Sequence, residues 1–132
     1  YACLLHDIGM FKVDADEQWD TDKIIQHPKL GYDLIKSISL WSSSADFILQ
    51  HHERYNGTGY PLANKADDIP LAARVLAVAD SFDELTSKNP YQKQPDYQTA
   101  LERIEANAGI YFDPQVVSVL KTVIADAGVL HD

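Results

Sequence analysis

The chain has 132 residues, a formal net charge of −9 at pH 7 and a single cysteine. A chain of this length fits one domain, which would bury about two thirds of the surface that it exposes when unfolded. The acidic balance argues against a general nucleic-acid binder, because non-specific affinity for nucleic acid comes from basic side chains that neutralise phosphates. One cysteine excludes an internal disulfide, and no apolar run has the length of a membrane span, so we expect a protein of the cytoplasm.

The chain opens at Tyr1 in what reads as the last turns of a helix that began upstream, with no initiator Met and no signal-peptide pattern. We therefore expect a piece of a longer protein, in which residues 1–132 form one domain that lacks its upstream helices. This first helix should stop near Gly9. Its end carries His6 and Asp7, which can supply one nitrogen and one oxygen ligand from the same place.

An acidic segment follows, and a second helix should then begin at Thr21 and run to His27. Pro28 predicts a fresh first turn there, which would put His27 at a helix junction. A solvated loop is favoured over a calcium site for the acidic segment, because the spacing is not that of a calcium loop. The acidic residues are Asp14, Asp16, Glu17, Asp20 and Asp22.

Two adjacent histidines, His51 and His52, end an apolar helical run that should be capped by the serines at 42–44. Both imidazoles lie at or beside the buried stripe of that helix. A lone inward histidine is more often a hydrogen-bonded core residue than a ligand. Two in tandem before a glycine-rich loop favour a metal site, because neutral imidazole is the commonest metal ligand.

The strongest helical pattern begins after Pro70, and an aspartate lies within it. Asp80 is surrounded by apolar residues, where an unpaired carboxylate costs several kcal/mol or more, so it needs a cation. Arg74 or a metal ion could serve, and the residues alone leave both open. The apolar positions recur every three or four residues and predict a continuous core stripe: Leu71, Val75, Val78, Phe82 and Leu85.

Two further helices are predicted, at about 96–108 and 113–127, with Pro114 in a first turn. No segment shows the alternation of a strand. The chain is therefore predicted to be all-α.

Four motifs in order make the chain resemble the HD-GYP family: HDIG at 6–9, HP at 27–28, HHERYNGTGYP at 51–61 and ARVLAVADSFDELTS at 73–87. The resemblance implies an HD-domain helical bundle, N-terminally incomplete here, with two or three divalent metals, iron or manganese, and hydrolysis of the bacterial messenger cyclic di-GMP. It implies that His6 and Asp7 belong to the catalytic centre and that Asp80 binds metal. The complete implied ligand set is His6, Asp7, His27, His51, His52 and Asp80.

This mixture of imidazole and carboxylate ligands suits iron, manganese or zinc better than magnesium or calcium. Two such cations about 3.5–4 Å apart would lower the pKa of a shared water to near neutrality and let it attack a phosphodiester. The loop with Gly59, Tyr60 and Pro61 would flank the pocket and contact the ligand or a partner signalling protein.

Three positions depart from the family pattern: Met10, Asn89 and Gln92 stand where the resemblance implies basic residues that contact phosphate. The family's further ligand from an upstream helix would precede Tyr1. Two hypotheses follow. The chain is a metal-dependent phosphodiesterase acting on cyclic di-GMP or another phosphate ester, or it is a degenerate metal-binding module that senses a ligand or docks a partner protein. The enzyme is favoured because the six ligands are intact, and neither a nucleic-acid nor a membrane partner is expected.

Overall fold

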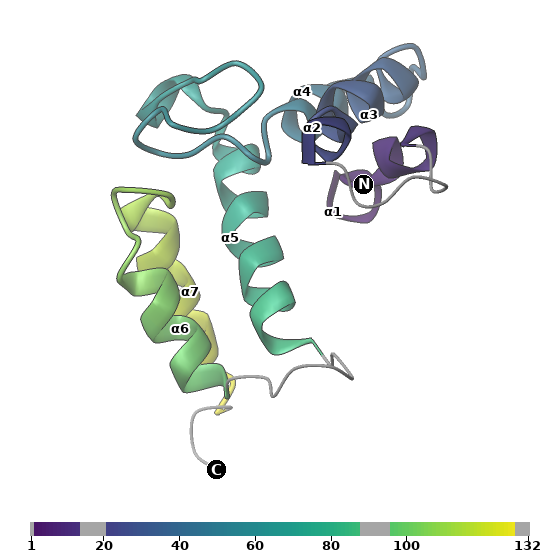
Figure 1. The fold of residues 1–132 in the computed structure, drawn as a ribbon. Coiled ribbons are helices and arrows are strands. Elements are labelled where there is room, and N and C mark those ends of the chain that lie inside the picture. Colours follow the sequence, from purple (N-terminus) through teal and green to yellow (C-terminus); the bar gives the residue numbers. More distant parts are fainter. Residues whose placement is uncertain (1, 14–20, 88–95, 129–132) are drawn as a thin grey trace.

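The computed structural model describes residues 2–13, 21–87 and 96–128 (Figure 1). Within these ranges the chain is helical and contains no strand, as predicted for an all-α domain. Among the same residues, no helix has both the length and the apolarity needed to cross a membrane. The elements are α1 (Ala2–Leu5), the 3₁₀ helix η1 (Ile8–Lys12), α2 (Thr21–Ile24), α3 (His27–Ile35), α4 (Ser42–Leu49), the 3₁₀ helix η2 (Ala66–Asp68), α5 (Leu71–Thr86), α6 (Tyr97–Glu105) and α7 (Pro114–Asp126).

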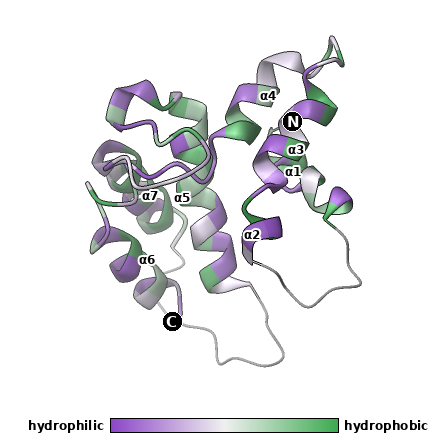
Figure 2. Cartoon of the chain, turned by 45° about the horizontal axis from the view of Figure 1, so that its top comes forward, coloured by the Kyte–Doolittle hydropathy of each residue, from purple (hydrophilic) through white to green (hydrophobic). Residues whose placement is uncertain are grey.

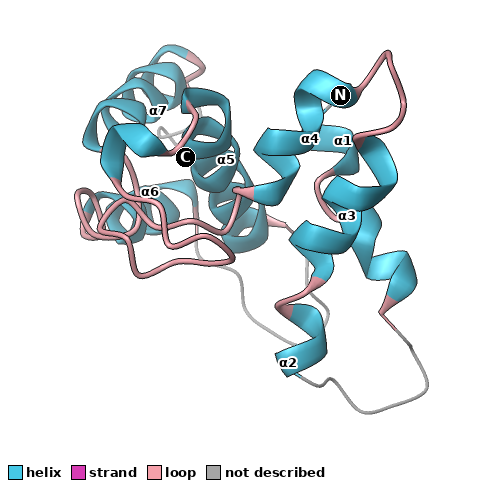
Figure 3. Ribbon diagram, turned by 90° about the horizontal axis from the view of Figure 1, so that it is seen from above, coloured by secondary structure: helices cyan, strands magenta, loops and turns pink. Residues whose placement is uncertain are grey.

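Helix α5 runs through the middle of the molecule, with α1 to α4 on one side and α6 and α7 on the other (Figures 1 and 3). Each side has its own apolar cluster. The first is centred on Ile35, Ala45 and Ile48, and the second on Val78, Ile104 and Val117. Helices α4 and α5 contact each other, so the two sides meet at that junction.

The helices are amphipathic, with hydrophilic and hydrophobic residues along the same element (Figure 2), and several begin where the sequence predicts. Asp96 and Asp113 cap α6 and α7, because their side chains accept hydrogen bonds from the backbone N–H groups of Thr99 and Gln115. Pro114 lies in the first turn of α7, and Pro28 in that of α3. The serine cap is wrong: Trp41 holds the N-cap of α4 and makes no side-chain capping bond.

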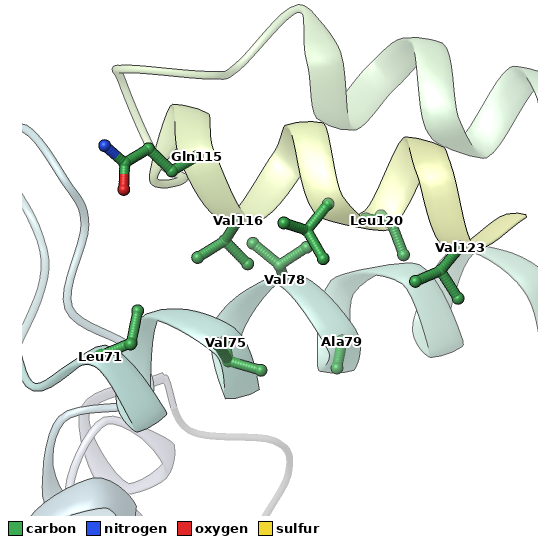
Figure 4. A pocket seen from close by; sticks show the side chains of 9 residues that line it. Leu71, Val75, Val78, Ala79, Gln115, Val116, Leu120 and Val123 are labelled. Carbon is green, nitrogen blue, oxygen red and sulfur yellow. The ribbon is translucent and has the colours of Figure 1, made fainter.

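The predicted core stripe of α5 is correct only toward its C-terminal half. Val78 is buried, but Leu71 is 59% exposed and Val75 46% exposed. These two line an apolar groove of about 440 Å³ between α5 and α7 (Figure 4). Periodicity identifies residues that share a helix face, but not how far a neighbouring helix covers that face. The groove has no titratable side chain, so acid–base or metal chemistry must lie elsewhere.

Candidate metal centre

The site lies where the N-terminal helices meet α5. Three segments of the first half converge there: the turn between α1 and η1, the first residue of α3, and the turn after α4. Helix α5 supplies the last side chain from the opposite side. The residues brought together are the six expected from the sequence, namely His6, Asp7, His27, His51, His52 and Asp80.

Asp7 is at the centre of this cluster. Its Oδ1 lies 3.2 Å from Nε2 of His27 and 3.9 Å from Nε2 of His51. Its Oδ2 lies 3.3 Å from Nε2 of His6, which is also 3.2 Å from Oδ1 of Asp80. The two oxygens of one carboxylate thus face different imidazoles.

Backbone carbonyls fix the orientation of three of the imidazoles. In each ring, Nδ1–H donates to the carbonyl oxygen three residues earlier, which leaves Nε2 directed into the cluster. This is the usual way in which a second hydrogen bond sets the tautomer of a metal-binding histidine. The donor–acceptor distances are 3.0 Å from His6 to Cys3, 2.7 Å from His27 to Ile24 and 2.7 Å from His51 to Ile48.

The donor set fits a metal ion, and the contact between His27 and His51 shows why. Their Nε2 atoms are 3.2 Å apart, and both Nδ1 atoms already carry the proton. Burial lowers the pKa of His51 to about 4, so its ring is neutral at pH 7. Because Nδ1 of both rings is bonded to a backbone carbonyl, Nε2 of each ring faces the other, and a cation between them could take both as ligands. Ligand atoms of His27, His51 and His52 all lie within 4.8 Å of one another, close enough to hold one ion.

The charges of the other ligands agree with a cation site. Hydrogen bonds to Asp7 and then to Asp80 raise the pKa of His6 to about 10. The pKa of Asp7 is lowered by hydrogen bonds from His27 and His6, and that of Asp80 by His6. Burial lowers the pKa of His52 to about 3. The carboxylates are therefore ionised at neutral pH, and a proton on His6 supplies the positive charge that a metal would otherwise provide.

Arg74 is not the partner of Asp80. Its Nη1 donates to Oδ2 of Asp113 at 2.6 Å and to Oδ1 of Asp67 at 3.0 Å. The alternative that an arginine neutralises Asp80 is therefore wrong. The contact of Asp80 is His6, inside the cluster.

Close backbone packing at Gly9 brings Asp7 to His27. A Cβ on Gly9 would lie 2.0 Å from the carbonyl oxygen of His27 and 2.6 Å from the backbone nitrogen of Gly31. Only glycine allows η1 to lie this close to the start of α3. The first helix stops at Leu5, a few residues before the expected Gly9, and Gly9 itself lies inside the 3₁₀ helix η1.

The loop after His52 folds back onto the cluster. Tyr60 stacks on His52, with ring centroids 5.0 Å apart and an interplanar angle of 23°. Gly59 allows this approach, since a Cβ there would lie 2.3 Å from the backbone nitrogen of Arg54. Pro61 follows as an exposed residue. The loop therefore lies beside the site at Tyr60, and its contact with a ligand or a partner protein stays a prediction.

Sequence reasoning missed Glu53, which holds this loop in place. Its side chain is buried, and Oε1 accepts the backbone N–H of Leu62 at 2.6 Å. Oε2 is buried and has no hydrogen-bond partner among the described residues. The available signal was the acidic residue directly after two histidines and before a glycine loop.

Of the three altered positions, Met10 lies in η1, three residues after Asp7. Asn89 and Gln92 lie outside the described residues, as do Asp14, Asp16, Glu17 and Asp20 of the acidic segment. Asp22 is an exposed residue in the first turn of α2.

A protein-family model described as "HD domain" matches residues 1–116. The chain belongs to the HD domain family. Among curated relatives of this HD domain, the cyclic di-GMP phosphodiesterase response regulator RpfG of Xanthomonas campestris is 36% identical over 129 residues, covering 90% of this chain and 34% of the relative. A cyclic di-GMP phosphodiesterase of Thermotoga maritima is 32% identical over 129 residues, covering 89% of this chain and 34% of the relative.

A solved structure of a cyclic GMP-AMP-specific phosphodiesterase of Vibrio cholerae has the same fold, with a TM-score of 0.75 at 23% identity, covering 98% of this chain and 38% of that one. The resemblance to HD-GYP proteins is thereby confirmed. This HD domain spans about a third of the length of the curated relatives that it matches.

Proposed function

We propose that this HD domain is the catalytic part of a metal-dependent phosphodiesterase that hydrolyses cyclic di-GMP. The observation that carries the proposal is the convergence of Nε2 atoms and carboxylate oxygens on one point. His27 and His51 direct Nε2 at each other across 3.2 Å, beside the carboxylate of Asp7.

The cluster is proposed to bind two divalent transition metals, iron or manganese. Its donors are four imidazoles and two carboxylates, a mixture that suits these metals and disfavours magnesium and calcium. Asp7 would be a ligand in this centre, because its two oxygens face different histidines at 3.2 and 3.3 Å. His27, His51 and His52 would hold one ion, and His6 with Asp80 the other.

When bound, two such cations would lower the pKa of a shared water and stabilise charge on the phosphoryl oxygens. The chain's own residues prepare this chemistry. The carbonyls of Ile24 and Ile48 keep two Nε2 atoms directed inward, so no reorientation is needed on metal binding. Tyr60 covers one face of His52 and limits water access to that ligand. The ionised Asp7 needs to lose no proton before it binds a cation.

The proposed substrate class is inferred from the names of the relatives. The two curated relatives described above are named cyclic di-GMP phosphodiesterases, and others of similar identity are named 3'3'-cGAMP-specific phosphodiesterases. A net charge of −9 leaves the proposed metals as the main attraction for a dianionic dinucleotide.

A second candidate is a metal-bound module that senses a ligand or docks a partner signalling protein through the loop at Gly59, Tyr60 and Pro61. Met10 favours it, because a thioether occupies a position where the family resemblance implies a cation for phosphate. Retention of all six ligands favours the enzyme.

The test is metal analysis of anaerobically purified full-length protein, combined with a cyclic di-GMP hydrolysis assay. We expect at least two metal ions per chain and hydrolysis that requires them. Asp80→Ala should reduce the metal content. Less than one metal per chain, with no further loss in Asp80→Ala, would refute the metal centre. Full metal content without hydrolysis would favour the sensing module.

A further inference from the structure

A small recess opens beside the six expected metal ligands, and residues other than these ligands also line it. It has a volume of about 180 Å³. His52 and Asp80 form one wall, and Arg54, Tyr111 and Phe112 are among the residues that form the rest. Pockets that enclose a whole drug-sized ligand have volumes of about 300–1,000 Å³. This recess therefore fits one portion of a dinucleotide, whose reacting phosphate would lie at the cluster.

Two chain segments that are distant in sequence fix Arg54 at this recess. The backbone N–H groups of Tyr55 and Asn56 donate to the carbonyls of Tyr111 and Ile110, each at 3.0 Å. The guanidinium of Arg54 lies over the ring of Tyr111, 4.3 Å from its centroid. A guanidinium stacked in this way keeps the hydrogen-bond donors on its edge available for a ligand.

The guanidinium of Arg54 also has no carboxylate partner among the described residues. Among the described residues, Arg74 pairs with Asp113, Lys121 with Glu105, and Lys36 with Asp33, whereas Arg54 makes no ion pair there. It is the one arginine or lysine in the lining of the recess, which also includes the carboxylates of Glu53, Asp80 and Glu84.

We propose that Arg54, supported by Tyr111, binds the phosphate of the cyclic dinucleotide that is not being hydrolysed. This inference rests on the proposed function and adds the residue that supplies cationic recognition where Met10 cannot. A planar guanidinium matches the oxygens of a phosphate in two parallel hydrogen bonds, which a lysine cannot reproduce. Tyr111 contributes by holding that plane in place.

The experiment compares Arg54→Ala and Arg54→Lys with Arg103→Ala in metal-loaded full-length protein. Arg103 is an exposed arginine on α6, so its loss makes the same change in net charge away from the recess. Arg54→Ala should raise KM for cyclic di-GMP about tenfold to a hundredfold, the loss expected for hydrogen bonds to a charged group, with a much smaller change in kcat. Arg54→Lys should recover only part of this loss, and Arg103→Ala should match wild type.

Two further measurements separate recognition from structure. Tyr111→Leu removes the ring that supports the guanidinium and should raise KM for cyclic di-GMP. Metal-depleted protein should still bind cyclic di-GMP weakly, and Arg54→Ala should abolish that binding with unchanged melting temperature.

The outcomes distinguish this inference from the proposed function. If wild type hydrolyses cyclic di-GMP and Arg54→Ala has the KM of Arg103→Ala, the role of Arg54 is refuted while the phosphodiesterase stands. If Arg54→Ala weakens only substrates with guanine and leaves an adenine-only cyclic dinucleotide unaffected, Arg54 reads a base and the phosphate assignment is wrong. If metal-loaded wild type hydrolyses no cyclic dinucleotide, the proposed function fails. Binding of cyclic di-GMP that requires Arg54 would then still support the subsite, and the absence of any binding would overturn both.

Discussion

The guanidinium of Arg74 on α5 lies 2.6 Å from the carboxylate of Asp113, which is only 3% exposed at the N-terminus of α7. The same carboxylate accepts the backbone N–H of Gln115 and so caps α7. One side chain therefore both starts α7 and ties it to α5. This pair holds the second half of the domain in register with the helix that carries Asp80.

The first prediction concerns this pair. Asp113→Ala leaves a mostly buried arginine without its principal partner and removes the cap of α7, so the free energy of unfolding should fall by about 3–5 kcal/mol. Equilibrium urea denaturation would measure it. Asp67→Ala is the matched control, because Asp67 also accepts from Arg74 but is 89% exposed on its side chain. That loss should stay below about 1 kcal/mol. Equal effects of the two changes would contradict the assignment.

The second prediction concerns Gly9. Gly9→Ala would place a methyl group against the first turn of α3, where a Cβ would be 2.0 Å from the carbonyl oxygen of His27. Relief requires η1 to move away, which should cost about 1–3 kcal/mol of stability and separate Asp7 from His27. Metal affinity should fall in parallel, as measured by titration with manganese.

Gly128→Ala is the control for that prediction. Its φ is +69°, but nothing lies within 4 Å of the added Cβ. It should cost about 1–2 kcal/mol through backbone strain alone and leave metal affinity unchanged. A Gly9→Ala variant with wild-type metal affinity would show that η1 does not position Asp7.

The third prediction concerns metal removal. A metal that binds only the folded state stabilises it by mass action, by about 2.7 kcal/mol at a free concentration one hundred times Kd. Chelation should therefore lower the melting temperature, and manganese or ferrous iron should restore it. Asp80→Ala should abolish most of this response, whereas Asp46→Ala, an exposed aspartate on α4, should retain it. A melting curve that is unchanged by chelator and by added metal would argue against a metal site of consequence.

Local sequence signals predicted the parts of the fold that depend on neighbours in the chain. Pro28 lies in the first turn of α3, and the helices expected from about 96 and 113 begin directly after Asp96 and Asp113, because helix starts are decided within about three residues. The ligands could be found because imidazoles and carboxylates on inward faces need a cation. Their grouping in space agrees with the motifs that carry the family resemblance.

Contacts between segments that are distant in the chain could not be predicted from the sequence. Arg74 and Asp113 are 39 positions apart, and no local pattern says that this arginine prefers Asp113 to Asp80. Glu53 reaches forward to the backbone of Leu62, a bond to a main-chain group that leaves no trace in residue types. Leu71 is exposed because α7 does not cover this part of α5, and the periodicity of apolar residues along α5 cannot predict how far another helix extends over it.

The fourth prediction concerns the missing positive charges. If Met10, Asn89 and Gln92 occupy positions from which phosphate is gripped, the wild type should be a weak cyclic di-GMP phosphodiesterase even when fully metallated. The triple variant Met10→Lys, Asn89→Arg and Gln92→Arg should raise kcat/KM, by about tenfold for each 1.4 kcal/mol of recovered transition-state binding. Steady-state kinetics with cyclic di-GMP would measure it, and each single change should help less than the triple.

The control for the triple variant makes the same change in net charge at exposed positions on other faces: Ser37→Arg, Ser43→Lys and Ala125→Arg. If general attraction of an anion to a less acidic chain were the cause, this control would gain as much as the triple variant, and its advantage would disappear at high salt because exposed charges are screened there. Specific contacts should leave the control near wild type. An efficient wild type would instead show that other residues, with Arg54 the leading one, already bind the phosphates, and the three altered positions would then have no role in substrate affinity.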